Sequence, residues 1–365
     1  MEALVNPSIW RGRRVFITGH TGFKGSWLAL WLADIGAEVT GYALPAPTNP
    51  SLFVEAGIAE LVTHITGDVR DLPKLQAAIV RARPEVVLHL AAQPLVRYSY
   101  DEPVETYATN VMGTVHLLEA CRHVDSIRAI VAVTSDKCYE NIESHRPYRE
   151  DDAMGGYDPY SSSKGAAELV ISAYRRSFFS SGVGVASVRA GNVIGGGDWA
   201  ADRLIPDIVR AVEVGKRPMI RSPNSIRPWQ HVLEALGGYL MIADRLIQRD
   251  ASAATGWNFG PDDDDAKPVS WIVENMLARW GLDPVGGWDR PDDVQPHEAN
   301  ILKLDCTKSR TQLGWKPAMT LADALQFVVE WHRSVFAGAN AREISLAQLQ
   351  QYRQSLIKKI PEFNA

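Results

Sequence analysis

A glycine-rich turn between a short apolar strand and a helix is the feature that most constrains how this chain folds. Residues 14–18 are expected to form the strand, and apolar side chains at helical spacing predict a helix over 26–35. Glycines in such a turn let backbone N–H groups approach a pyrophosphate, whose charge the helix N-terminus favours. The turn therefore predicts a dinucleotide site made by Gly19, His20, Thr21, Gly22, Phe23, Lys24 and Gly25.

Strands and helices are expected to alternate along the first half of the chain. The pattern predicts strands at 38–42, 61–66, 85–89, 127–134 and 183–188, and helices at 72–82, 104–122 and 160–180. No hairpin turn separates the strands, which indicates a parallel sheet covered on both faces. We expect an α/β fold, with a Rossmann-type doubly wound sheet at 11–190 that the chain rejoins around 227–260.

The second half of the chain predicts a smaller mixed lobe at 191–340. Gly, Pro and Trp become frequent there, and helices are expected near 204–214, 271–280 and 321–336. Residues 341–365 predict a C-terminal tail with one amphipathic helix.

Composition argues against several classes of partner. Hydrophobic residues make up 46% of the chain, charged residues 22%, and the net charge is −5. No basic stripe indicates nucleic acid, and no segment approaches the ~18 apolar residues of a membrane helix. The three cysteines lack metal-ligand spacing and are interpreted as reduced thiols of a cytoplasmic protein, so no metal site is expected.

Side chains at the ends of later strands complete the predicted cofactor site. Asp68, followed by Val69, ends the third strand, where a carboxylate can accept a hydrogen bond from the adenine amino group. The fourth strand ends in residues that let the chain pass beneath the cofactor: Leu90, Ala91 and Ala92.

The end of the second strand bears on which nicotinamide cofactor binds. Residues 41–45 contain neither an acid for a ribose 2′-hydroxyl nor an arginine for a 2′-phosphate. We therefore expect NAD rather than NADP. Because His20 and Lys24 add bulk and charge to the turn, we also expect weak binding.

A tyrosine and a lysine one helical turn apart predict hydride-transfer chemistry. Tyr160 and Lys164 share a helix face, and an ammonium group there would favour the phenolate form of the tyrosine. Tyr160 can then take a hydroxyl proton while hydride leaves for the nicotinamide. Thr134 or Ser135, at the end of the fifth strand, can bind the same hydroxyl.

An acid and an amine, Asp136 and Lys137, come directly after Ser135 in the sequence. A plain dehydrogenase needs neither Asp136 nor Lys137, so this pair indicates oxidation coupled to loss of water. A local salt bridge is the structural alternative.

Together these motifs resemble the extended short-chain dehydrogenase/reductase family. Asn110-Val-Met-Gly-Thr is similar to a cofactor-side motif of that family, and Asn192 to its sugar-nucleotide diphosphate contact. Arg227-Pro-Trp-Gln-His-Val resembles its later substrate-phosphate motif. The resemblance covers roughly residues 14–317.

Lys137 indicates which branch of this family the chain resembles most. Related dTDP-glucose dehydratases carry glutamate at this position, whereas lysine is shared by CDP-glucose 4,6-dehydratases and inverting UDP-N-acetylglucosamine dehydratases. Segments 195–199, 202–207, 227–232 and 296–299 are similar to the CDP-glucose branch. The resemblance implies CDP-glucose as substrate and a place in deoxysugar biosynthesis, with Tyr160 acting at sugar carbon 4, Lys137 as base at carbon 5 and Asp136 as acid at carbon 6.

The substrate side of the site is less constrained by pattern. Expected contacts are Gln93, Ser135, Tyr160, Asn192, Arg203, Arg227, Arg290 and His297. A UDP-N-acetylglucosamine dehydratase, a 4-epimerase and a non-catalytic NAD(P)-binding sensor stay open as alternatives. The resemblance also implies a homodimer or homotetramer through helices 104–122 and 160–180. Candidate apolar contacts are Leu117, Leu118, Leu169 and Ile171, although core packing against the sheet would use the same residues.

Overall fold

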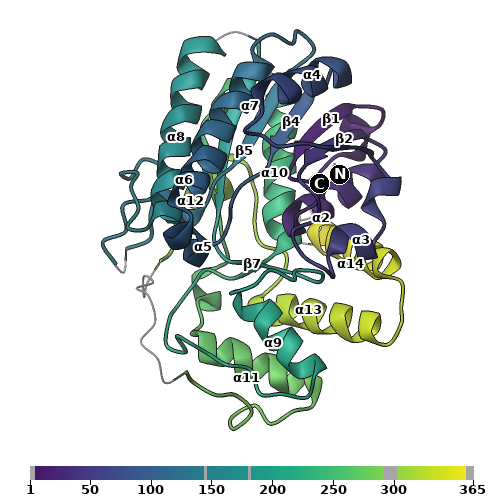
Figure 1. Cartoon of the computed structure of the whole chain (residues 1–365), viewed down its shortest axis with the longest axis vertical. Coiled ribbons are helices and arrows are strands. Elements are labelled where there is room, and N and C mark those ends of the chain that lie inside the picture. Colours follow the sequence, from purple (N-terminus) through teal and green to yellow (C-terminus); the bar gives the residue numbers. More distant parts are fainter. Residues whose placement is uncertain (1–4, 144–145, 180–181, 292–301, 359–365) are drawn as a thin grey trace, which may run out of the picture.

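The computed structural model describes residues 5–143, 146–179, 182–291 and 302–358. Within these residues, seven parallel strands form the main sheet, in the order β3-β2-β1-β4-β5-β6-β9 (Figure 1). Their bounds are β1 (Arg14–Thr18), β2 (Glu38–Ala43), β3 (Thr63–Thr66), β4 (Val86–His89), β5 (Ala129–Val133), β6 (Gly184–Ala190) and β9 (Gly256–Phe259). The predicted doubly wound α/β fold is confirmed.

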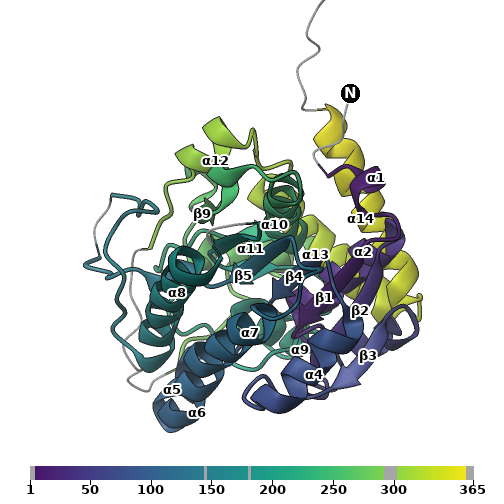
Figure 2. The ribbon, with the colours of Figure 1, turned by 90° about the horizontal axis from the view of Figure 1, so that it is seen from above.

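Helices cover both faces of the sheet, as Figure 2 shows from above. One face packs on α4 (Leu72–Ala82), α7 (Gly113–Cys121) and α8 (Pro159–Phe178), whose apolar side chains form one buried cluster with the strands. The other face packs on α2 (Phe23–Asp34) and α10 (Val232–Ile247). The near-continuous apolar strands follow from this double cover.

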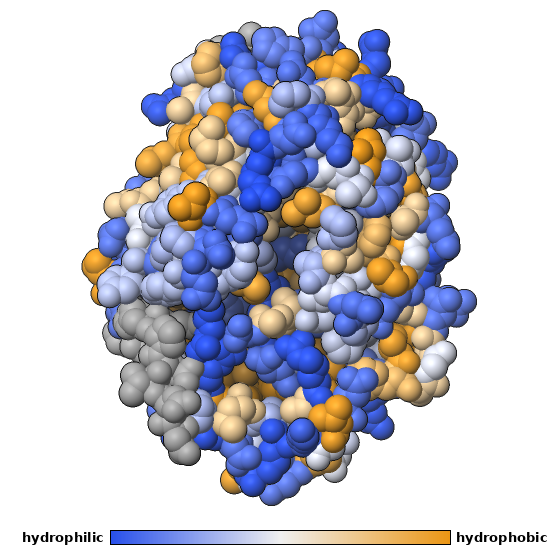
Figure 3. All heavy atoms as spheres, in the orientation of Figure 1, coloured by the Kyte–Doolittle hydropathy of each residue, from blue (hydrophilic) through white to orange (hydrophobic). Residues whose placement is uncertain are grey.

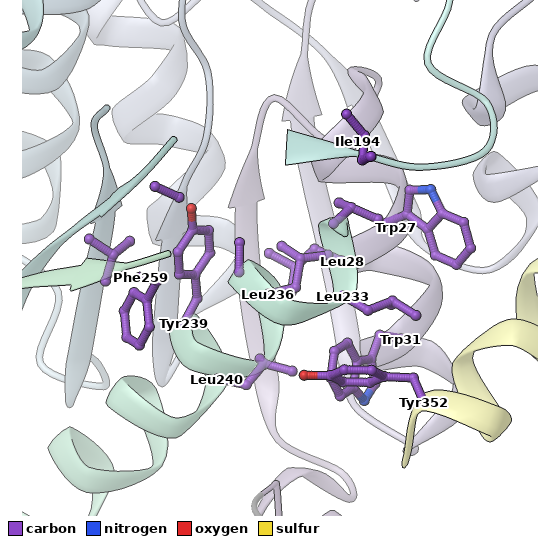
Figure 4. Close-up of a cluster of buried hydrophobic side chains, with 14 of the residues drawn as sticks. Trp27, Leu28, Trp31, Ile194, Leu233, Leu236, Tyr239, Leu240, Phe259 and Tyr352 are labelled. Atoms are coloured by element: carbon purple, nitrogen blue, oxygen red, sulfur yellow. The ribbon is translucent and has the colours of Figure 1, made fainter. Parts of the chain in front are cut away.

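The larger of the two buried apolar clusters includes the contact between α2 and α10. Trp27, Leu28 and Trp31 of α2 face Leu233, Leu236 and Leu240 of α10 (Figure 4). The C-terminal helix α14 (Ala341–Lys358) joins this core through Tyr352, whose ring packs edge-on against Trp31. The Tyr352 hydroxyl donates to Glu234, 3.0 Å away.

The remaining segments build the second part of the molecule and its connections. They are β7 (Val193–Ile194), β8 (Gln230–His231), α9 (Leu204–Glu213), α11 (Val269–Trp280), α12 (Thr307–Gln312) and α13 (Leu321–Phe336). Earlier in the chain are α1 (Pro7–Trp10), α3 (Leu52–Glu55), α5 (Val96–Asp101) and α6 (Pro103–Tyr107). Short turns are η1 (Ile58–Glu60), η2 (Ala108–Met112), η3 (Asp136–Cys138), η4 (Ala251–Ala253) and η5 (Asp263–Asp265). α9, α11 and α13 lie below the sheet in Figure 1.

Two sequence expectations change. The single helix expected at 104–122 is α6 and α7 joined by η2, a π-helical turn. The long α10 and strand β9 were expected only as an unspecified return of the chain near 227–260. The domain bounds given above stay predictions. In the described part of the chain, no helix is long and apolar enough to span a membrane.

Asp244 generates a stability prediction. It is buried on α10, and desolvation raises its pKa to about 7, with the Asn6 backbone and Arg13 only partly opposing this. Because the folded protein holds this proton more tightly than the unfolded chain does, the protonated carboxyl contributes its full stability below pH ~4. This contribution is lost as the pH rises to about 7, where the folded carboxyl ionises. We expect Asp244→Asn to flatten the fall in the free energy of unfolding over this window and to stabilise the protein at pH 8 by about 4 kcal/mol at most. Urea unfolding at several pH values measures this, and an unchanged pH profile would contradict it.

Candidate active site

A cavity of about 540 Å³ opens at the carboxyl ends of the strands. Figure 3 shows the hollow on the face between the sheet and the lower lobe. Parallel strands deliver their ends to one edge, where ligands of open α/β sheets bind. The cavity gathers predicted residues from both halves of the chain: Gly19, Thr21, Gly22, Phe23, Lys24, Gly25, Asp68, Val69, Leu90, Ala91, Ala92, Thr134, Ser135, Asp136, Lys137, Tyr160, Lys164, Asn192, Arg203 and Arg227.

The glycine turn fits a dinucleotide. Gly19 has φ +77°, and a Cβ there would lie 2.6 Å from the Ala91 backbone nitrogen, so the turn and the end of β4 pack as only glycine permits. Gly22 is the N-cap of α2 and lines the cavity. A Cβ on Gly22 would have only the Gly19 oxygen near it, at 3.5 Å, so a side chain there would enter the space a pyrophosphate needs.

The two unusual residues of the turn behave differently. The His20 ring does not border the cavity; it is buried, and its Nε2 lies 2.7 Å from Nδ1 of His64. Lys24 does border the cavity, and burial lowers its pKa to about 8, with nearby Arg203 acting in the same direction. Of the two residues expected to disturb the turn, Lys24 is therefore the one that borders the ligand space.

Asp68, which the sequence predicts to meet adenine, is an ionised carboxylate at the cavity wall. Arg70 donates to both oxygens of Asp68: its Nε lies 3.1 Å from Oδ1 and 2.9 Å from Oδ2, and its Nη2 lies 2.6 Å from Oδ2. These bonds lower the pKa of Asp68. The carboxylate keeps lone pairs for further donors. After β2, the cavity is lined by Ala43, Leu44 and Pro45, without a charged group.

The acid Asp136 lies deep in the cavity wall, 3% exposed, directly after β5. Ser135 donates to its Oδ1 over 3.0 Å, while Oδ2 has no partner within the described chain. Burial raises the pKa of Asp136, although Lys137 opposes this. A raised pKa is what a proton donor at a departing hydroxyl requires.

Tyr160 and Lys164 begin helix α8, whose N-cap Asp158 accepts from the Ser161 N–H over 2.9 Å. Burial raises the Tyr160 pKa to about 12, with Ser135 acting in the opposite direction, so the expected stabilisation of the phenolate by Lys164 does not dominate in this structure. Burial also lowers the Lys164 pKa to about 8, and its ammonium lies 3.4 Å from the Val133 carbonyl.

A buried ion pair fixes the strand and helix that carry these groups. Glu168, one turn beyond Lys164, accepts from Arg189 at 2.9 and 2.8 Å and from Ser187 at 2.7 Å. Thr134 donates to the same carboxylate. Burial alone would raise the Glu168 pKa, but Arg189 outweighs it and the pKa is lowered. The pair locks α8 to the ends of β5 and β6.

Some predicted residues do not border the cavity. Asn110 lies in the π-helical turn, where its amide donates to Ser163 over 2.8 Å and its Oδ1 accepts from the Gln93 N–H over 2.8 Å. Gln93 and Asn110 thus join the exit of β4 to α8. Arg290 lies over the Trp288 ring, 5.4 Å from its centroid. His297 lies outside the described residues.

Other lining residues had no assigned role in the sequence analysis. Asp198 and Asp202 belong to segments noted there only for their resemblance, and Arg221 belongs to no motif. All three border the cavity. Among the described residues, no group of three His, Cys, Asp or Glu side chains could hold a metal ion.

Comparison with known proteins places this geometry in a family. The family model described as GDP-mannose 4,6 dehydratase matches residues 16–327. A CDP-glucose 4,6-dehydratase of Salmonella typhimurium is 54% identical over 355 residues, covering 96% of this chain and 98% of the relative. A dTDP-glucose 4,6-dehydratase of Streptomyces griseus is 29% identical, covering 88% and 95%.

A solved structure supports the same placement. MoeE5 in complex with UDP-glucose and NAD is 25% identical and superposes with a TM-score of 0.74, covering 88% of this chain and 99% of the other. The glycine turn, the Tyr160–Lys164 pair and the acid after β5 all lie within residues 16–327, which the family model matches. The chain belongs to the GDP-mannose 4,6-dehydratase family of the extended short-chain dehydrogenases/reductases.

Proposed function

We propose that this protein is an NAD-dependent CDP-D-glucose 4,6-dehydratase, a hydro-lyase that makes CDP-4-keto-6-deoxy-D-glucose. The observation that carries the proposal is the meeting of Asp136 and Lys137 with Tyr160 and Lys164 in one cavity beside the glycine turn. The relative that shares 54% identity over nearly the whole chain bears the same activity in its name.

The first half of the reaction is an oxidation at sugar carbon 4. Tyr160 takes the proton of the carbon-4 hydroxyl, and Ser135 holds that hydroxyl. Bound NAD would accept the hydride from carbon 4 and later return it to carbon 6. Tyr160 would be favoured as the phenolate when oxidised NAD is bound, because the positive charge of the cofactor would oppose the effect of burial.

The second half is an elimination. The carbon-4 ketone acidifies the proton on carbon 5, and Lys137, acting as a neutral amine, removes it. Asp136 gives its proton to the carbon-6 hydroxyl, which leaves as water. The protonated Lys137 would return a proton to carbon 5 as the hydride returns to carbon 6, which completes the 4-keto-6-deoxy sugar. Tyr160 would then lose one proton and Asp136 regain one through solvent, so that both groups are ready for the next cycle.

The expected product tests the function. With CDP-glucose and NAD⁺, NMR should show a new methyl group and a ketone, whereas a 4-epimerase gives no methyl group. NADP⁺ should support much less turnover, because no positive group follows β2 to bind a 2′-phosphate. Equal products from UDP-N-acetylglucosamine, or no product from any nucleotide-glucose, would contradict the proposal; the latter would favour an NAD(P)-binding sensor.

Lys137→Ala tests the assignment of the base. We expect turnover to fall about 100-fold or more, the range of a lost general base, with reduced nicotinamide accumulating and carbon-5 exchange with solvent lost. Absorbance and deuterium exchange measure these effects. Lys74→Ala, an exposed lysine on α4, is the matched control. Turnover of Lys137→Ala at the wild-type rate would overturn the assignment.

A homo-oligomer through α6, α7 and α8 also stays a proposal. Leu117, Leu118 and Ile171 are 0–1% exposed and belong to the core. These three candidate contacts therefore cannot lie in an interface between copies. Leu169 is 63% exposed on α8, and Val104 is 80% exposed on the neighbouring α6. This apolar face suits a second copy of the chain.

Leu169→Glu should shift the protein toward the monomer, because a charge would be buried against the second copy. Light scattering measures the mass. Val285→Glu, at a residue 77% exposed in the other lobe, is the control. A wild-type monomer, or an oligomer indifferent to Leu169→Glu, would contradict the proposed face.

A further inference from the structure

The substrate arm of the cavity has a definite order of charges. Arg203 and Arg227 lie close enough to the chemistry to act on the pKa of Tyr160 and of Asp136, respectively. Arg203 is also anchored to buried Asp198 over 3.1 Å. These two arginines therefore suit the diphosphate next to the reacting sugar.

A third arginine of the cavity is paired differently. Arg221 borders the cavity, but its charged partners are Asp202 and Asp207 instead of any catalytic group. Its Nη1 donates to Asp202 over 3.0 Å and its Nη2 to Asp207 over 3.1 Å. A guanidinium has five N–H donors, so three stay available to a ligand.

The two carboxylates are not equivalent. Asp207, in the first turn of α9, has both oxygens paired, one to Arg210 and one to Arg221. It holds the Arg221 guanidinium in place. The Asp202 Oδ1 pairs with Arg221 and lies 3.9 Å from Arg97, while its Oδ2 makes no hydrogen bond to the described residues. Asp202 also borders the cavity, so this oxygen is a ready acceptor.

Apolar side chains flank this charged set. Ile205 and Ile220 are 2% and 1% exposed and line the cavity beside it, together with Leu204 and Met219. A flat ring with one polar edge suits such surroundings: the faces meet aliphatic carbon and the edge meets the charges.

We propose that Asp202 and Arg221 select cytosine, an inference that rests on the proposed function. The cytosine edge presents the N4 amino donor next to the N3 and O2 acceptors. The Asp202 carboxylate accepts from N4, and Arg221 donates to N3 and O2. Uracil and thymine reverse two of the three positions, which sets O4 against the carboxylate and the N3 hydrogen against the guanidinium. The same pair thus attracts cytosine and repels the other two pyrimidines.

Competitive binding of CDP and UDP to the full-length protein tests this inference without turnover. Asp202→Asn keeps a residue that tolerates the left-handed backbone at φ +57° and replaces the carboxylate by an amide that can donate. We expect the preference for CDP over UDP to fall about 10-fold or more. Arg221→Gln should lower the preference as well, chiefly through weaker CDP binding.

Asp289→Asn is the matched control. Asp289 pairs with Arg217 over 3.0 Å, its side chain is 45% exposed like that of Asp202, and it does not border the cavity. The control should keep the wild-type preference, and melting curves verify that each variant is folded.

The outcomes separate this inference from the function itself. A wild-type protein that makes product from CDP-glucose but keeps its CDP preference in both variants would overturn the role of Asp202 and Arg221 alone. A wild-type protein that binds UDP as well as CDP would also overturn it. Preference for CDP that is lost in the variants, with no turnover of CDP-glucose, would support base selection while contradicting the proposed reaction.

Discussion

The common direction of the strands in the main sheet is the constraint on which the rest of the structure depends. It brings the glycine turn after β1, Asp68 after β3, Ala91 after β4 and Asp136 after β5 to one edge. Residues that are more than 100 positions apart in the sequence therefore line one cavity. The covering helices then fix its depth, because α8 presents Tyr160 and Lys164 beside the end of β5.

Basic side chains outnumber acidic ones around this cavity. Among the residues that the structure describes, seven basic ones border it (Lys24, Arg97, Lys137, Lys164, Arg203, Arg221 and Arg227), against five acidic ones (Asp68, Asp136, Asp198, Asp202 and Asp207). Such an arrangement suits two ligands that each carry a diphosphate. Burial offsets part of the mutual repulsion by lowering the pKa of Lys24 and of Lys164 to about 8. The Glu168–Arg189 pair supplies rigidity next to the candidate catalytic groups, since Glu168 also holds Thr134.

Local pattern predicted strands β1 to β6 but not β9, and it singled out candidate catalytic residues that the cavity brings together. Apolar runs and helical spacing predicted β1, α4 and α13 at or near their observed bounds, because these segments bury continuous apolar faces. The glycine turn and the Tyr160–Lys164 spacing depend on chemistry that the sequence displays directly.

Features that depend on tertiary contacts could not be read in this way. In the π-helical turn, Asn110 is hydrogen-bonded to Gln93 and Ser163, which are distant in sequence. The His20 ring turns away from the cavity toward His64, and the burial of Leu117 and Leu118 depends on the sheet they meet. Arg221 belongs to no motif, and only the fold sets it beside Asp202 and Asp207.

In the proposed reaction, one cavity carries out oxidation, elimination and reduction on the same sugar. Conversion of CDP-glucose deuterated at carbon 4 tests it most directly. If the hydride taken from carbon 4 returns to carbon 6 within one bound complex, NMR will show deuterium in the methyl group of the product. A methyl group without that deuterium, or a product that keeps deuterium at carbon 4, would contradict the account.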